Sequence, residues 1–155
     1  MATLTVNQPL THHYTYTAPY GNATERTHQL VTNDKGIAQN SNEKAAIEAG
    51  DVVILGELPE GFCMTDATVF VMKGFTGAAS LGFEYADGID HPDVPQDDKY
   101  FFEDKVIADA ARIRADGSKL YVLPKPANLI LTCAATNTKA SELRVVVNGE
   151  LVGAN

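Results

Sequence analysis

The sequence predicts an all-β protein, built as a two-sheet antiparallel sandwich of jelly-roll type with at most one or two short helices. Short alternating or β-branched runs recur along the 155 residues, and turn residues (Gly, Pro, Asn, Asp) close each run. Few segments are compatible with a helix, and this pattern is typical of sandwiches and barrels. A chain of this length can bury a core as one unit, so we expect a single domain over residues 1–155.

The N-terminal region contains two alternating runs that Pro9 separates. Residues 2–7 place Leu4 and Val6 on one face, and residues 12–17 place Tyr14 and Tyr16 on one face. Two interpretations remain open for this Thr- and Tyr-rich segment. Residues 1–20 are either an extended arm that orders on contact with a partner, or they include an ordinary edge strand.

The β signal strengthens after residue 50, and two other segments are ambiguous. Residues 42–49 can form a short helical turn that ends at Gly50. Residues 106–113 are the best helix candidate by propensity, although a strand there stays open. The predicted strands are 28–33, 52–55, 65–73, 79–85, 119–123, 128–133 and 142–147.

Charge and hydropathy exclude two classes of partner. The formal net charge is −8, and no cluster of Lys and Arg is present to neutralise phosphates, so we expect no nucleic-acid binding. No apolar run approaches the roughly 20 residues that span a bilayer. The first residues also lack the pattern of a secretory signal, so we expect none.

Neither the cysteines nor the histidines form a recognisable reactive group. Cys63 and Cys133 lie in apolar stretches without metal or redox spacing, so we expect buried reduced thiols, with a disulfide as the alternative. His12 and His13 adjoin on a predicted strand and therefore point to opposite faces, which prevents joint ligation of one metal. No catalytic motif is present, including the clustered histidines of a cupin, and we expect a protein that is not an enzyme.

The acidic stretch 86–98 is the main site-like feature. Residues 84–104 hold eight acidic side chains against one lysine, Lys99. Pro92, Pro95 and Gly88 predict a long surface loop, and loops of this length are often functional. Such a loop can supply oxygen ligands for Ca²⁺, although the spacing is not that of an EF-hand; a solvated acidic loop is the alternative. The candidate calcium ligands are Asp87, Asp90, Asp93, Asp97 and Asp98.

Five short motifs occur in a fixed order between residues 50 and 135. They are Gly50-Asp51-Val52-Val53, Leu58-Pro59-Glu60-Gly61, Thr65-Asp66-Ala67-Thr68-Val69, the Leu81–Gly88 segment Leu-Gly-Phe-Glu-Tyr-Ala-Asp-Gly, and Asp98-Lys99-Tyr100-Phe101. In this order they resemble the small capsid decoration (cement) proteins of tailed bacteriophages. The first 45 residues and the acidic stretch match that group less well.

The resemblance implies a jelly-roll protein, a homotrimer in many members of the group, that binds the major capsid protein. Such a protein is made in the host cytoplasm and staples shell subunits together on the virion surface, without a cofactor. Another virion role, such as a head-fibre base, a tail component or a glycan-binding module, is the competing hypothesis, and a metal-dependent jelly-roll enzyme is the third. The candidate contact residues are Thr3, Thr5, Tyr14 and Tyr16 in the N-terminal segment and Tyr100, Phe101 and Phe102 beside the acidic loop.

Overall fold

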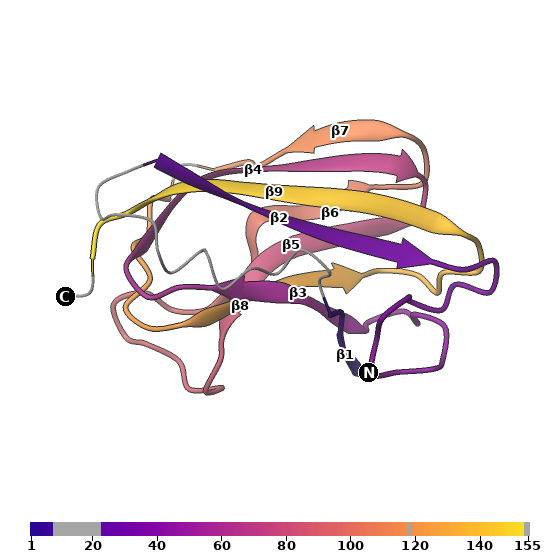
Figure 1. Cartoon of the computed structure of the whole chain (residues 1–155), viewed down its shortest axis with the longest axis horizontal. Helices are drawn as coiled ribbons and strands as arrows, with labels where there is room; N and C mark the ends of the chain where they lie inside the picture. Colours follow the sequence, from indigo (N-terminus) through magenta and orange to yellow (C-terminus); the bar gives the residue numbers. More distant parts are fainter. Residues whose placement is uncertain (8–22, 118, 154–155) are drawn as a thin grey trace.

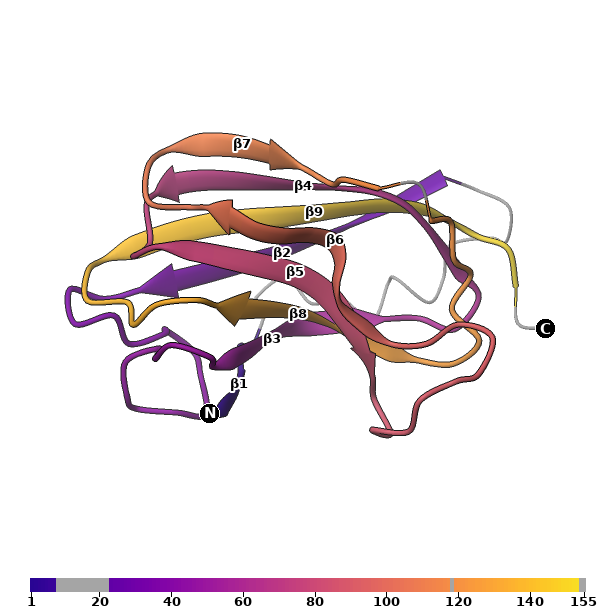
Figure 2. The same cartoon turned by 180° about the vertical axis from the view of Figure 1, so that it is seen from behind.

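The computed structural model describes residues 1–7, 23–117 and 119–153, and these form two sheets packed face to face (Figures 1 and 2). No helix occurs among the described residues, and therefore none that could cross a membrane. The strands are β1 (Thr3–Thr5), β2 (Ala23–Thr32), β3 (Val52–Leu58), β4 (Phe62–Lys73), β5 (Ala78–Tyr85), β6 (Asp97–Val106), β7 (Ala111–Arg114), β8 (Ala127–Cys133) and β9 (Ser141–Leu151).

The strand order confirms the predicted sandwich and its jelly-roll type. One sheet has the order β1-β3-β8-β5-β6 and the other β2-β9-β4-β7. From β2 to β9, successive strands pass from one sheet to the other except at β5–β6, which is the double Greek-key path of a jelly roll. The one departure is β1, which joins the edge of the five-stranded sheet parallel to β3.

The core lies between the sheets and follows the two-residue period of the strands. In β9, Leu143, Val145 and Val147 are fully buried, and the residues between them are exposed or half-buried. Strand β8 faces them with Leu129 and Leu131, also fully buried. Burial of each such side chain contributes roughly 1.5–3 kcal/mol, so these strands provide much of the driving force for folding.

Both candidate helices are absent, and tertiary contacts explain the difference. In the 106–113 segment, Val106 ends β6 and Ala111 begins β7, which pairs antiparallel with β4. Helix propensity is a weak preference, and the pairing with β4 together with the burial of Ile107 outweighs it. In the 42–49 segment, Ile47 is fully buried and its amide donates to Gly36 O at 3.1 Å, which holds the backbone in an irregular path. The 119–123 segment is no strand either: Val122 forms an isolated β-bridge with Cys63, and Leu123 exchanges backbone hydrogen bonds with Gly61 and Phe62.

The N-terminal residues that the structure describes belong to the sandwich. Leu4 is buried, and Thr3–Thr5 pair with residues 52–54 of β3. Asn42 closes the outer edge of β1, since its side-chain oxygen accepts from the Thr5 amide at 2.9 Å. Residues 3–5 therefore form the edge strand that was one of the two interpretations. Residues 8–20 of the expected arm, with Tyr14 and Tyr16, lie outside the described residues.

A buried asparagine joins the loop before β9 to the rest of the sandwich. Asn137 is 1% exposed, and its side-chain amide donates to Thr32 Oγ1 on β2 at 3.1 Å. Its side-chain oxygen accepts from the Thr76 amide between β4 and β5 at 3.2 Å, and its own amide donates to Ile47 O at 2.8 Å. The side chain and backbone amide of this one residue thus satisfy polar groups from three separate parts of the chain.

A histidine lies between the two sheets at the β2 edge. His28 is buried, and its ring occupies the space that a Cβ at Gly56 of β3 would fill. Burial lowers the pKa of His28 to about 4, with the Arg26 guanidinium as a second cause, and a hydrogen bond with the backbone of Leu55 offsets part of this effect. The folded protein therefore holds His28 neutral at pH values where an unfolded chain would protonate it.

We predict that Asn137→Ala lowers the free energy of unfolding by about 2 to 4 kcal/mol, because it leaves several buried polar groups without partners. Urea unfolding followed by circular dichroism measures this change. Thr138→Ala, at the exposed neighbouring position, is the matched control and should change stability little. Equal effects of the two substitutions would contradict the structural role of Asn137.

We predict that stability falls as the pH drops from about 6.5 to about 4, because the unfolded state binds a proton on His28 that the folded state does not. The pKa difference corresponds to about 3 kcal/mol, present in full above the unfolded pKa and lost towards the folded one. In His28→Leu, urea midpoints should vary less with pH over this range. His91→Leu, in a surface loop, should keep the wild-type slope; an unchanged slope in His28→Leu would contradict the prediction.

Candidate interaction surfaces

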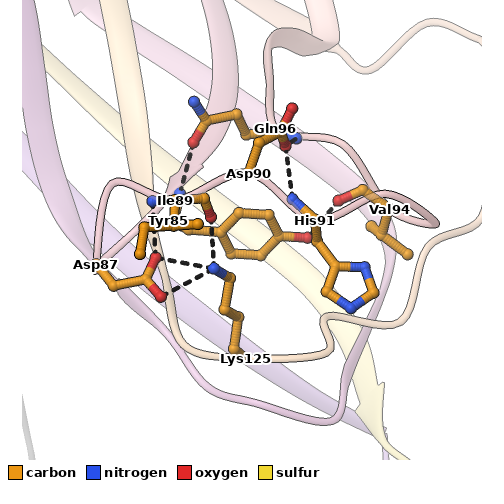
Figure 3. Close-up of polar contacts among 8 residues, drawn as sticks. All are labelled: Tyr85, Asp87, Ile89, Asp90, His91, Val94, Gln96 and Lys125. Atoms are coloured by element: carbon orange, nitrogen blue, oxygen red, sulfur yellow. Dashed lines mark hydrogen bonds and ion pairs between the residues drawn. The ribbon is translucent and has the colours of Figure 1, made fainter.

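The acidic loop between β5 and β6 is organised around a lysine from another part of the chain. Lys125 Nζ lies 2.9 Å and 2.8 Å from the two carboxylate oxygens of Asp87 and also donates to the Ile89 carbonyl (Figure 3). The same ammonium lies 4.5 Å from the centroid of the Tyr85 ring, within the range of a cation–π contact. The hydrogen bond from Lys125 keeps the pKa of Asp87 below its usual range.

Further hydrogen bonds fix the remainder of the loop. Asp90 Oδ1 accepts from the backbone amides of His91 at 2.9 Å and Gln96 at 2.7 Å. The Gln96 side chain accepts from the Tyr85 amide at 3.2 Å, and the Tyr85 hydroxyl donates to the Val94 carbonyl (Figure 3). Burial, together with Asp90 and Asp87, raises the pKa of Tyr85 to about 12, so the hydroxyl remains a donor at all physiological pH values.

The structure does not assemble the calcium site that the sequence suggested. Among the described residues no three His, Cys, Asp or Glu side chains come together as metal ligands. Asp87 forms an ion pair with Lys125, and Asp90 accepts hydrogen bonds from backbone amides. Asp97 accepts a hydrogen bond from the Lys99 amide at 2.9 Å. Asp93 and Asp98 lie exposed to solvent, apart from these. The described residues thus give the calcium site no support, and Lys125 already supplies a cation to Asp87 from within the chain; calcium binding by this loop stays a prediction.

The aromatic run beside the loop is largely core. Phe101 and Phe102 are each 2% exposed, so in this structure neither side chain is available to a partner. Tyr100 is half-buried, stacks on Tyr121 with ring centroids 5.4 Å apart, and donates its hydroxyl hydrogen to the Lys119 carbonyl at 2.9 Å. The sequence pattern misled here because the adjoining Phe101 and Phe102 are both buried where β6 bulges against β5. Thr3 and Thr5, by contrast, are exposed on β1.

One cavity of about 290 Å³ opens between β4, β6 and the segment after β7. Met64, Tyr100 and Phe101 contribute apolar and aromatic lining, and the Asp66–Arg114 ion pair lies at its side. The lining residues that the structure describes include no histidine or cysteine, so they supply no nucleophile activated by an imidazole.

Both cysteines are free and buried, which confirms the expectation of reduced thiols. Burial raises the pKa of Cys133 to about 12, and burial is also the main cause of the raised pKa of Cys63. Because the thiolate is the reactive form, neither sulfur is activated as a nucleophile.

Sequence reasoning missed two features of the surface, which are Lys125 and the arginines of β7. Lys125 stands in a Pro-Lys-Pro turn, and no local pattern connects it to a loop some 36 residues earlier. Arg112 fell in the 106–113 segment that favoured a helix, and Arg114 follows that segment directly, which concealed that both belong to strand β7. The alternation of apolar and charged residues in Ala111-Arg112-Ile113-Arg114 is the signal that a strand interpretation would have used.

We predict that Lys125→Met loosens the loop while the sandwich stays folded. The substitution keeps an apolar stem against Tyr85 but removes the ammonium, so amides in residues 86–96 should exchange with deuterium faster. The ion pair is partly exposed, so the free energy of unfolding should change little.

Lys119→Met is the matched control, because its ammonium lies 3.5 Å from Asp97 and does not enter the loop interior. Exchange in residues 86–96 should be unchanged in this control. Calcium-dependent protection of the loop in the unsubstituted protein, or unchanged exchange in Lys125→Met, would show that Lys125 is not the organising cation.

Comparison with solved structures relates the whole fold to chains in phage capsid structures. A chain in the capsid of Ralstonia phage GP4 has a TM-score of 0.65 and 13% identity, over 99% of both chains. A chain of the cyanophage Pam1 capsid asymmetric unit has a TM-score of 0.54 and 15% identity, over 86% of this chain and 91% of that one. A chain of the acidic stable capsid of Helicobacter pylori bacteriophage KHP30 has a TM-score of 0.54 and 14% identity, over 87% and 92%.

Neither the protein-family models nor the curated proteins contain a match to this sequence. At 13–15% identity the three structures establish the fold, and they do so over nearly the full length of the chain. The chain is thus a jelly roll of the same overall form as chains found in three phage capsid structures.

Proposed function

We propose that this chain is a structural protein of a tailed-phage virion that binds the outer surface of the capsid and cements neighbouring shell subunits. The observation that carries the proposal is the end-to-end similarity to a chain of the Ralstonia phage GP4 capsid, which covers 99% of both chains. A fold shared over part of the chain would fit many roles, since jelly rolls serve many functions. Because the alignment leaves almost no part of either chain unmatched, it supports a protein of the same size and the same structural class.

The surface of the molecule is consistent with a contact role. The 86–98 loop is held in one shape by Lys125 and Asp90, so it can present its side chains without a large ordering cost. The net charge of −8 supports a position outside the shell, away from packaged nucleic acid. The partner in this proposal is the major capsid protein.

The glycan-binding alternative loses the feature that supported it. That hypothesis used an exposed aromatic platform at Tyr100, Phe101 and Phe102, and two of these side chains lie in the core. The remaining half-buried ring, Tyr100, is covered on one face by Tyr121. We therefore give the capsid surface preference over host recognition.

Co-sedimentation with phage heads that lack the protein tests the proposal. Purified full-length chain should bind heads to saturation at a fixed ratio to shell subunits. The loaded heads should release their DNA at a higher temperature than bare heads, because cross-linked subunits resist internal pressure. Purified tails serve as the control surface. Binding to tails but not to heads would replace the capsid role by a tail role, and binding to neither would refute both.

A further inference from the structure

The outer face of the four-stranded sheet carries a row of side chains that crosses all four strands. Cross-strand pairing places Gln29 (β2) opposite Arg144 (β9), Arg144 opposite Phe70 (β4), and Phe70 opposite Arg112 (β7). Their neighbours in sequence on β4 and β9 are buried in the core, so this row points outward. The Arg112 guanidinium lies 4.8 Å from the centroid of the Phe70 ring. We name Arg144, Phe70 and Arg112 the arginine row.

The two arginines of this row have no acidic partner among the described residues. Neither Arg112 nor Arg144 has a carboxylate within 4.0 Å in the part of the chain that the structure describes, and both are exposed. The nearby acids have other partners: Asp66 pairs with Arg114, and Glu142 accepts from the Gln29 amide at 3.1 Å. The chain has four arginines, and three of them lie on this one sheet face, in a protein of net charge −8.

An aromatic ring between two guanidinium groups has the composition of a binding centre. Aromatic residues and arginine are enriched at the centre of protein interfaces, where they contribute most of the binding energy. A guanidinium also matches a carboxylate in geometry and can donate two parallel hydrogen bonds to it. The surface complementary to the arginine row is therefore an apolar side chain with carboxylates around it.

The 86–98 stretch of the same protein, which is the loop after β5 together with the first two residues of β6 and is called the 86–98 loop, has this complementary pattern. Ile89 is 65% exposed near carboxylates of the loop. Asp93 and Asp98 are exposed, and no cation lies within 4.0 Å of either among the described residues. In both views the loop protrudes at the bottom of the molecule, while β7 and β4 run along the top (Figures 1 and 2). The loop therefore cannot reach the arginine row of its own copy.

We propose that the arginine row binds the 86–98 loop of a second copy of this chain, with Ile89 of one copy against Phe70 of the next. The contact joins two different surfaces, so it is head-to-tail, and an open chain of copies keeps one free loop at one end and one free row at the other until a ring closes. One loop on one sheet face makes a small interface, and such contacts are weak and sensitive to salt. The inference concerns the protein alone and does not depend on the proposed capsid role.

The first test measures the mass of the purified full-length protein by light scattering at increasing concentration. At about 0.05 M salt the average mass should rise with concentration, and at about 0.5 M salt it should fall back towards that of the monomer, because the shorter Debye length screens the charges. A constant monomer mass at low salt, up to millimolar protein, would overturn the proposal. A mass rise that salt does not reduce would also overturn it.

The second test uses two charge-reversed variants and their mixture. Arg112→Glu with Arg144→Glu reverses the row, and Asp93→Lys with Asp98→Lys reverses the loop without touching the residues that hold its shape. Each variant alone should remain monomeric at low salt, since the row and the side chains at positions 93 and 98 then carry charges of the same sign. An equimolar mixture should associate, because the loop of the first variant still fits the row of the second. This recovery also shows that both variants are folded.

Lys35→Glu with Lys44→Glu is the matched control, since it makes the same change in net charge at exposed positions away from the row and should associate like the unsubstituted protein. A mixture that stays monomeric would assign the self-association to another surface. Loss of head binding in the row variant, with the mass of the unsubstituted protein constant, would identify the occupant as the shell protein and overturn a contact between copies.

Discussion

Strand β9 is the element on which the rest of the four-stranded sheet depends. It pairs with β2 along the whole of β2 and with β4 along most of β4, so two strands take their register from it. The burial of Val145 between the sheets fixes which residues face outward, because a shift by one residue would bring Arg144 into the core. The register that hides the valines therefore also places Arg144 beside Phe70. The register of β9 thus determines both the packing of the core and the position of Arg144 on the surface.

The fold class was predictable because strand period and turn residues are local signals. Residues 128–133 and 142–147 alternate or run apolar, and they became β8 and β9 with longer bounds. The segment 106–113 was not predictable, since its Ala-rich sequence favours a helix and only the pairing with β4 makes Ala111–Arg114 a strand. The parallel pairing of Thr3–Thr5 with β3 is likewise a long-range contact that no local pattern indicates.

The surface was harder to predict than the core because its features also depend on contacts between residues far apart in the chain. The sequence located the acidic loop, but the partner of Asp87 is Lys125, which comes from a turn far along the chain. The run Tyr100-Phe101-Phe102 suggested a surface platform, whereas tertiary packing buries Phe101 and Phe102. The arginine row is assembled from three strands that are not consecutive in the chain, so it exists only once the register of the sheet is set.

Lys125 holds the acidic loop by a means that differs from a bound metal ion in how it depends on the medium. A bound metal ion leaves when its free concentration falls, whereas Lys125 is covalently part of the chain and has a fixed, high effective concentration at Asp87 and Ile89. The shape of the loop is therefore supported by a cation that the chain itself carries. In the proposed capsid role, a loop held in this way would keep the same exposed surface in fluids rich and poor in divalent cations.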